Sequence, residues 1–378
     1  MKIRVLVVDD SAVMRAVLTE IINQAPDMEV VGSAPDAAVA RQKVKELSPD
    51  VLTLDVEMPN MNGLEFLDKV MRLRPMPVIM ISSQTAQGSE TTLQALELGA
   101  VDYVAKPRGS LAGLPVSYAQ EIHEKIRAAH GARLKVLRTG ASGGAASAAA
   151  VRPAVTVRPS SPASASTLLP TAAAAPVASS WGDRIICIGA STGGTEAIKE
   201  VLCRLPENVP GIVMVQHMPE MFTSSFARRL DTLARVRVKE AEQGERILPG
   251  HAYLAPGHSH LEIRRSGNGY FCELLQTPPY NRHRPAVDVL FNSAAQHARG
   301  SAVAALLTGM GKDGAQGMLA MRRAGAWTIG QDQDSCVVYG MPREAAQIGA
   351  CCEVAPLTQV AERILAALSH GRKLTAPV

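Results

Sequence analysis

The sequence lacks any long apolar run, and its beginning lacks the pattern of a secretory signal. No stretch reaches about 18 consecutive apolar residues, the length that would suggest a membrane span. From Met1 the chain passes directly into an alternating strand pattern, without an apolar signal core. These absences predict a cytoplasmic protein with no direct membrane insertion.

Neither positive nor negative charge is in large excess, and aromatic residues are few. Thirty-nine Lys and Arg against 35 Asp and Glu give a net charge of +4 over 378 residues. Such a small surplus produces little long-range field, so nucleic acid and anionic membranes are not expected partners. Aromatic residues make up 3% and hydrophobic residues 47% of the chain. This composition excludes overall disorder and predicts cores built from aliphatic side chains and Ala.

Cysteine is absent from the first 186 residues, and no two cysteines are spaced as C-x-x-C. In a chain without an export signal, this usage predicts buried free thiols rather than disulfides or zinc ligands. The six cysteines are Cys187, Cys203, Cys272, Cys336, Cys351 and Cys352.

Acidic residues are missing between Thr139 and Ser180, where Ala, Ser, Pro, Gly, Thr and Val dominate and five prolines recur. This segment cannot bury enough side chain to offset the entropy of ordering, so it is predicted to be a flexible linker. The length of the chain also favours two domains. We therefore expect one domain over 1–125, with its last helix running to about 138, the linker over 139–180, and a second domain over 181–370.

Strand-like runs alternate with helical periods in both domains, which predicts an α/β fold. The first domain shows five strands and five helices, as expected for a five-stranded parallel, flavodoxin-like sheet covered on both faces. The same alternation restarts at Arg184 and predicts a doubly wound, mostly parallel α/β domain with a Rossmann-like core. Antiparallel hairpin material is expected around 261–276.

Polar residues gather at the predicted carboxyl ends of the first-domain strands, where ligands of open parallel sheets bind. Three converging carboxylates would repel one another unless they held a hard cation, and all-oxygen ligation suits Mg²⁺. A metal, a lysine and a hydroxyl around one carboxylate make a phosphoryl-transfer site with an aspartate nucleophile. The alternative, carboxylates that only cap helices, explains Asp10 or Ser11 singly but not Asp55 together with Lys106. The residues at these strand ends are Asp9, Asp10, Asp55, Ser82, Ser83 and Lys106.

The motifs V-L-V-V-D-D-S, L-D-V-E-M-P-N-M-N-G, S-S and K-P occur in this order over residues 1 to about 125. They resemble the receiver domain of two-component response regulators. The resemblance implies a histidine kinase as phosphodonor and Mg²⁺ as the cofactor of phosphorylation. It also implies roles for individual residues: Asp55 as phosphoacceptor, Asp9, Asp10 and Asp55 as metal ligands, Ser82 and Lys106 as phosphate contacts, and Tyr103 as the switch aromatic.

The second domain opens with a strand that runs into G-A-S-T-G-G, where glycines let a tight turn present the Ser191 hydroxyl. His217 and Asp313 also follow predicted strands, so the three residues could converge as nucleophile, base and orienting carboxylate. Each also has a structural alternative: a helix N-cap for Ser191, a core histidine for His217, a turn or cap residue for Asp313. A glycine-rich first turn is equally typical of a dinucleotide- or phosphate-binding loop.

The combination of G-A-S-T-G-G, V-Q-H-M-P and T-G-M-G-K-D-G-A after a receiver-like domain resembles the CheB family of protein-glutamate methylesterases. The resemblance implies Ser191 as nucleophile, His217 as base, Asp313 as orienter, and the backbone N–H groups of Thr192 and Met310 as oxyanion donors. It implies hydrolysis of glutamyl methyl esters on methyl-accepting chemoreceptors, deamidation of receptor glutamines, and no cofactor for the esterase reaction. Lys312 departs from the family, in which Asn is common at this position.

Two further expectations concern the whole chain, which we expect to be a monomer. In the unphosphorylated state, the first-domain face near Tyr103 and the last helix of that domain should cover the Ser191 cleft, and phosphorylation should weaken this contact. The basic run Asn281-Arg282-His283-Arg284-Pro285 is expected to line the mouth of the cleft and to meet acidic receptor surface. The competing hypothesis is a response regulator whose output domain binds a nucleotide or a partner without catalysis.

Overall fold

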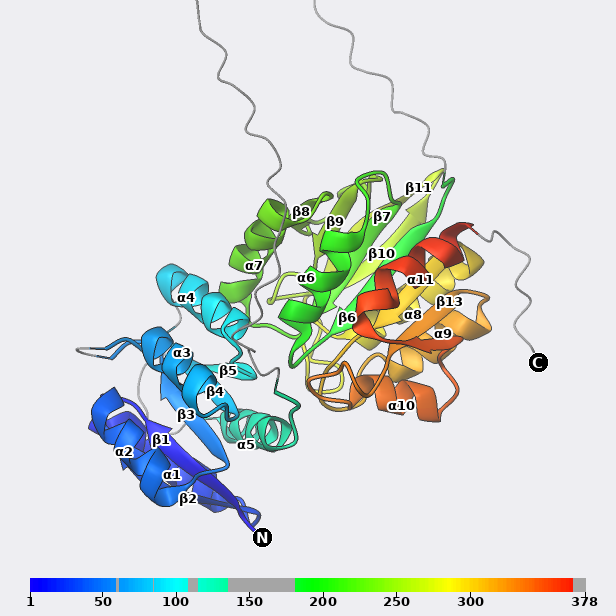
Figure 1. Ribbon diagram of the computed structural model, residues 1–378. Helices are drawn as coiled ribbons and strands as arrows, with labels where there is room; N and C mark the ends of the chain where they lie inside the picture. Colours follow the sequence, from blue (N-terminus) through cyan, green and yellow to red (C-terminus); the bar gives the residue numbers. More distant parts are fainter. Residues whose placement is uncertain (59–60, 84, 108–114, 135–180, 370–378) are drawn as a thin grey trace, which may run out of the picture.

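The structure is a computed structural model that describes residues 1–58, 61–83, 85–107, 115–134 and 181–369 (Figure 1). The predicted linker over 139–180 lies outside these ranges. Within them, no helix has the length and apolar character needed to cross a membrane. All six cysteines are free thiols; Cys187, Cys272 and Cys336 are buried, and the other three are partly buried.

The first domain is built on a five-stranded parallel sheet in the order β2-β1-β3-β4-β5, as the sequence predicts. Strands β3 and β4 are buried along their whole length, which explains their continuous apolar sequences. The strands are β1 Ile3–Val8, β2 Met28–Ala34, β3 Val51–Asp55, β4 Val78–Ser82 and β5 Asp102–Ala105. The helices are α1 Ala12–Gln24, α2 Ala37–Leu47, α3 Gly63–Leu73, α4 Ala86–Glu97 and α5 Val116–His130.

The second domain contains a seven-stranded parallel sheet in the order β14-β13-β12-β6-β7-β9-β8. An antiparallel β10–β11 hairpin lies beside it, where antiparallel material was predicted. The strands are β6 Ile185–Ala190, β7 Gly211–Gln216, β8 Arg237–Glu240, β9 His251–Leu254, β10 His260–Ser266, β11 Gly269–Leu275, β12 Ala302–Leu306, β13 Trp327–Gln331 and β14 Glu353–Ala355. The helices are α6 Gly194–Arg204, α7 Glu220–Leu233, α8 Val287–His297, α9 Ala315–Arg323, α10 Met341–Gln347 and α11 Leu357–Ser369, with a short 3₁₀ turn at Arg299–Ser301.

Helices cover both faces of this sheet, which confirms the doubly wound fold. Residues of α6, α7 and α11 form one core against the sheet, and residues of α8, α9 and α10 form the other. The central strand β6 lies between β12 and β7, so the connections wind away from it in both directions. In open α/β sheets this reversal is where ligands bind, beyond the carboxyl ends of the strands. The turn that carries Ser191 begins at this end of β6.

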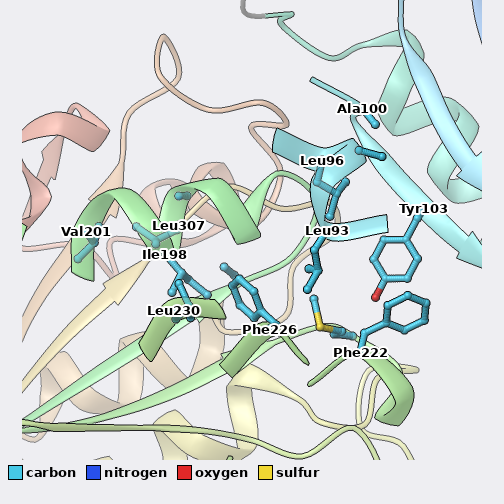
Figure 2. Close-up of a cluster of buried hydrophobic side chains, with 14 of the residues drawn as sticks. Leu93, Leu96, Ala100, Tyr103, Ile198, Val201, Phe222, Phe226, Leu230 and Leu307 are labelled. Atoms are coloured by element: carbon cyan, nitrogen blue, oxygen red, sulfur yellow. The ribbon is translucent and has the colours of Figure 1, made fainter. Parts of the chain in front are cut away.

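The two domains share a continuous apolar contact, in which α4 and β5 of the first domain pack against α7 of the second (Figure 1). Figure 2 shows Leu93, Leu96 and Tyr103 on one side of this contact and Phe222 and Phe226 on the other. The rings of Tyr103 and Phe222 lie 4.4 Å apart between centroids. The first domain therefore rests on the second through buried side chains.

Candidate functional site

The first-domain acidic cluster forms where three segments meet at the carboxyl edge of the sheet. One carboxylate oxygen from each of Asp9, Asp10 and Asp55 lies within 4.8 Å of the others. Asp9 and Asp55 are buried, whereas Asp10 is exposed. The ammonium group of Lys106 lies 2.8 Å from Oδ2 of Asp55 and 3.4 Å from Oδ2 of Asp9. The structure thus brings these four predicted site residues together.

The electrostatics of this cluster suit a hard cation. Burial raises the pKa of Asp55 to about 6, although its hydrogen bond with Lys106 and the charge of that lysine act in the opposite direction. Burial also raises the pKa of Asp9. Oδ2 of Asp9 accepts no hydrogen bond from any residue that the structure describes. Oxygen-only donors from a cluster of carboxylates are the set that Mg²⁺ prefers, so the residues fit the metal.

Ser82 and Tyr103 point away from this cluster. The Ser82 hydroxyl donates to the carbonyl of Gly88 at 3.2 Å and lies 2.6 Å from the hydroxyl of Thr92, both in α4. Its contact with a phosphoryl group stays a prediction. Tyr103 is buried against Phe222, and its hydroxyl has no hydrogen-bond partner within the described ranges. Its switch role likewise stays a prediction, although the ring lies at the contact between the domains.

Ser191 lies on a tight turn between β6 and α6. Gly193 in this turn has a φ of 78°, a left-handed conformation that glycine adopts without strain. Gly194 follows, and a side chain there would lie 2.1 Å from Oε1 of Gln216. The amide of Gln216 donates to the Ser191 carbonyl at 2.9 Å. The sequence folds locally this way because only glycine fits so close to the neighbouring strand end, and the turn leaves Ser191 partly exposed.

His217 occupies the equivalent position after the adjacent strand. Ala190 pairs with Gln216 in the sheet register, so Ser191 and His217 each come directly after paired residues. The His217 amide donates to the Ala190 carbonyl at 3.1 Å. The imidazole is 7% exposed, and its Nε2 lies 2.8 Å from Oδ2 of Asp313. Nδ1 has no hydrogen-bond partner among the described residues, so no bond yet joins it to the Ser191 hydroxyl.

Asp313 is a buried carboxylate with several donors. It accepts hydrogen bonds from the Val287 and Asp288 amides and from the Asn281 side chain, in addition to the contact with His217. Burial by itself would raise its pKa, but the hydrogen bond and charge of His217, with the other donors, outweigh burial and lower the pKa. The carboxylate is therefore ionised at neutral pH and can orient the imidazole and stabilise an imidazolium.

The two predicted oxyanion donors flank Ser191. Thr192 is the next residue, and Met310 follows Gly309, whose missing side chain would lie 2.7 Å from Cβ of Ser191. In the part of the chain that the structure describes, neither the Thr192 nor the Met310 backbone N–H donates a hydrogen bond. Unpaired N–H groups beside a nucleophile can stabilise a developing oxyanion.

Two groups at this site were not assigned roles from the sequence. The imidazole of His283 stacks on that of His217, with ring centroids 3.8 Å apart and planes 11° from parallel. Asn281 donates to Asp313 at 3.1 Å and to Asp288 at 2.8 Å. Both belong to the compact basic run that was predicted to line the mouth of the cleft, but neither residue was predicted to contact the triad. The sequence offered no periodic signal for their contact with the triad residues.

The first domain covers this site. Oδ2 of Asp102 accepts a hydrogen bond from the Thr192 hydroxyl, directly beside Ser191, and Oδ1 lies 3.2 Å from the ammonium of Lys125. Further contacts surround this bond: Arg282 pairs with Glu124 at 2.7 Å, Arg133 with Asp334 at 2.6 Å, and Glu97 with both Arg229 and Lys199. In this arrangement a bulky substrate could not approach the Thr192 side of Ser191.

Comparison with known proteins covers both domains. The family model of the CheB methylesterase matches residues 186–364, and that of the response regulator receiver domain matches residues 5–112. Two curated relatives, both named protein-glutamate methylesterase/protein-glutamine glutaminase, match almost the whole chain. The protein from Nitrosomonas europaea is 57% identical over 98% of each chain, and that from Thiobacillus denitrificans is 56% identical over 99% of each chain.

Among solved structures, the chain is similar to the CheB methylesterase catalytic domain of Thermotoga maritima. That domain is 39% identical, covers 49% of this chain and 98% of its own, and has a TM-score of 0.48.

Proposed function

This chain belongs to the CheB methylesterase family and carries a response regulator receiver domain, and from this premise we propose its reaction, substrate and control. It hydrolyses glutamyl methyl esters on methyl-accepting chemoreceptors and deamidates receptor glutamines. A histidine kinase supplies the phosphoryl group that activates it through Asp55. The protein acts in the cytoplasm, where the receptor helices carrying these side chains are accessible.

The observation that carries this proposal is the contact between His217 and Asp313 beside the Ser191 turn. The Ser191 hydroxyl attacks the ester carbonyl while Nδ1 of His217 takes its proton, and Asp313 holds the imidazole through Nε2. The backbone N–H groups of Thr192 and Met310 stabilise the tetrahedral oxyanion. The imidazolium then returns its proton to the methoxide, so methanol leaves and an acyl-serine remains.

A water molecule completes the reaction by the same steps in reverse. His217 removes a proton from the water, the hydroxide attacks the acyl-serine, and the proton returns to Ser191 as the glutamate carboxylate leaves. Deamidation of glutamine follows the same path, with ammonia as the leaving group. No step of this sequence draws on the acidic cluster of the first domain.

The acidic cluster serves the phosphorylation of the receiver. Asp9, Asp10 and Asp55 would hold Mg²⁺, which neutralises charge during phosphoryl transfer when it is bound. A carboxylate oxygen of Asp55 attacks the phosphoryl group as the bond from phosphorus to the histidine of the kinase breaks, and Lys106 pairs with the oxygens of the aspartyl phosphate. The all-oxygen donor set of this cluster supports this assignment.

Control follows from the cover that the first domain forms over Ser191. Phosphorylation changes activity only if the two receiver states differ in affinity for the second domain. Moving the covered fraction from 99% to 1% needs a difference of about 5.5 kcal/mol. Two contacts would have to break to uncover the cleft. They are the hydrogen bond between Asp102 and Thr192 and the buried contact between Tyr103 and Phe222.

Methanol release from methylated receptor membranes tests this function, with acetyl phosphate and Mg²⁺ to phosphorylate the enzyme. We expect Ser191→Ala to abolish release, since it removes the nucleophile, and Ser266→Ala, an exposed serine of β10, to leave it unchanged. Asp55→Asn should retain the resting rate but lose the response to acetyl phosphate. Full methanol release by Ser191→Ala would refute Ser191 as the nucleophile, and the absence of release by the phosphorylated wild-type protein would favour the non-catalytic binding module.

A further inference from the structure

The imidazole of His283 lies flat on the imidazole of His217, although it belongs to an irregular segment between β11 and α8. The ring centroids are 3.8 Å apart and the planes are within 11° of parallel. The two histidines come from segments 66 residues apart in the sequence. A second imidazole, brought from a distant part of the sequence, therefore lies parallel to the ring of the proposed base.

A single hydrogen bond leaves the His217 ring poorly restrained. The bond from Nε2 to Asp313 fixes one edge of the ring, but rotation about Cβ–Cγ can still tilt the ring plane. On the opposite edge, Nδ1 has no hydrogen-bond partner within the described residues. The contact with His283 on one face of the His217 ring therefore limits the rotation of that ring. A flat neighbour at van der Waals distance permits only ring orientations close to its own plane.

The segment that carries His283 is itself tied to the triad carboxylate. Tyr280 and His283 exchange two backbone hydrogen bonds, of 3.0 and 2.9 Å, across a two-residue turn. The central residues Asn281 and Arg282 both have positive φ, 51° and 69°, as a type I′ turn requires. Glycine is usual in such a turn, because a left-handed conformation strains a residue that carries a side chain, as Arg282 does.

Asn281 compensates for part of this strain, because its side chain connects the turn to the site. Nδ2 donates to Oδ1 of Asp313 at 3.1 Å and to Oδ2 of Asp288 at 2.8 Å. Asp288 also accepts from the Gly317 amide at 2.6 Å, so the turn is anchored to both α8 and α9. Asp313 thus holds one edge of the His217 ring directly. Through Asn281 it also fixes the position of the His283 ring, which covers the face of His217.

The protonation state of His283 fits this arrangement. Burial and the neighbouring charge of His217 lower the pKa of His283 to about 3, so its ring is neutral at pH 7. The charged or titratable groups that act on it are His217, Asp313 and Arg282, and Lys125 of the first domain. A neutral ring can remain stacked when His217 becomes an imidazolium, whereas a charged ring would repel it.

We propose that His283 is a positioning residue for the hydrolysis: its ring, stacked on the face of His217, holds Nδ1 of the base toward Ser191. The proposal rests on the proposed function, in which His217 is the base. His283 acts through shape, by a flat ring in contact with another flat ring. It follows that an aromatic ring without nitrogen can replace it, whereas a polar side chain that is not a ring cannot.

The test compares three substitutions in the full chain, phosphorylated with acetyl phosphate, by kcat and KM for methanol release. We expect His283→Ala and His283→Asn to lower kcat by about ten- to hundredfold, because small displacements of a catalytic group have effects of this size. KM should change less than about twofold. His283→Phe should stay within about threefold of wild type, and His130→Ala, an exposed histidine at the end of α5, should match wild type.

Three outcomes would overturn the proposal: wild-type kcat in folded His283→Ala, a His283→Phe as slow as His283→Ala, or an active His283→Asn. The last two would assign His283 a polar contact with the substrate. Should His283→Ala fail to fold, as thermal unfolding would reveal, the comparison of Phe with Asn still decides.

A readout independent of esterase activity separates this proposal from the proposed function. The Nε2 proton of His217, observed by NMR of ¹⁵N-histidine protein, should be retained in His283→Phe and should broaden through exchange in His283→Ala. Active Ser191→Ala would refute the proposed function while leaving this signal unaffected. An unchanged Nε2 signal in His283→Ala would refute positioning while leaving Ser191 as the nucleophile.

Discussion

At the scale of single residues, Asp313 connects more of the active site than any one contact suggests. Its two oxygens meet the imidazole of His217, the Asn281 amide and the backbone N–H groups of Val287 and Asp288. A buried carboxylate with this many donors is both an electrostatic partner and a structural anchor. Its replacement should therefore affect catalysis and folding in separable ways.

We expect Asp313→Asn to lower kcat for methanol release by roughly 10³–10⁴-fold, because the amide would favour the wrong tautomer of His217. The variant should also unfold more easily at neutral pH, by about 2–4 kcal/mol, since buried donors lose a charged acceptor. Steady-state kinetics and urea denaturation at pH 7 measure the two effects. Asp68→Asn, which removes a partly exposed partner of Arg72 in α3, is the matched control.

The stability difference has a predictable pH dependence. The pKa of Asp313 is lower in the folded protein than in the unfolded chain, so the carboxylate stabilises the fold above its unfolded value of about 3.9. This contribution is lost as the pH falls. The gap between wild type and Asp313→Asn should thus be full at pH 7 and narrow as urea titrations are repeated toward pH 4 and below. A gap that widens on acidification would contradict the assignment.

The residues that could be predicted are those that follow regular strands. Ser191, His217 and Asp313 come after parallel strands, whose carboxyl ends share one edge of the sheet, so their convergence follows from topology. His283 and Asn281 lie in an irregular turn that has neither the glycine nor the periodicity that would mark it. Their contacts depend on tertiary packing, which a local pattern does not encode.

At the scale of elements, the loop after β12 determines the space available to the nucleophile. A side chain at Gly309 would lie 2.3 Å from the sulfur of Met341 and 2.7 Å from Cβ of Ser191. Backbone hydrogen bonds join Gly309 to Val338, Gly340 and Met341, so the loop cannot easily retreat. The nucleophile turn, this loop and the start of α10 therefore form one closely packed unit.

Gly309→Ala should displace Ser191 and with it the oxyanion donors. We expect kcat to fall about tenfold or more, since misplacement of reacting groups is costly, with a stability loss of about 1–3 kcal/mol from overpacking. Gly300→Ala is the control, because its new side chain would meet its nearest neighbour at 3.4 Å. Kinetics and thermal unfolding of both variants measure the effect. If Gly309→Ala and Gly300→Ala had the same kcat, the loop after β12 would accommodate the new side chain without displacing Ser191.

The elements themselves were predictable where alternation was strong. The predicted five strands and five helices of the first domain, and the antiparallel hairpin predicted around 261–276, are all observed. Three elements near the carboxyl end, β14, α10 and α11, were not predicted. Strand β14 has three residues with an exposed centre, and α10 has seven residues beginning after Gly340 with a proline in its first turn, so neither shows a clear period.

At the scale of the whole molecule, the contact between the domains combines a buried apolar centre with a charged edge. Tyr103 and Phe222 lie in the centre, and the edge includes Glu97 of α4, which pairs with Arg229 of α7 and Lys199 of α6. The sequence predicted that the face near Tyr103 would cover the cleft, but it could not identify these pairs. The two members of each pair lie on different domains, whose surfaces meet only after each sheet has folded.

The charged edge gives a test of control that leaves the active site intact. In Arg229→Glu, attraction between α4 and α7 becomes repulsion between two carboxylates that are about one-third exposed. A change of about 1–2 kcal/mol in the contact corresponds to roughly a 5–30-fold shift toward the uncovered state. Methanol release by the unphosphorylated protein should rise by up to this factor, and release after acetyl phosphate should stay at the wild-type level.

Arg228→Glu is the matched control for this charge reversal. Arg228 is the preceding residue of α7, exposed, and hydrogen-bonded to Ser224 and Ser225 of its own helix. The same change of net charge there should leave the resting rate unchanged, which separates loss of the contact from a general effect of charge. If both variants raise the resting rate equally, long-range charge rather than the Glu97–Arg229 pair determines how firmly the first domain covers the cleft. If neither does, the apolar centre at Tyr103 holds the domains together without the charged edge, and control must act through that centre.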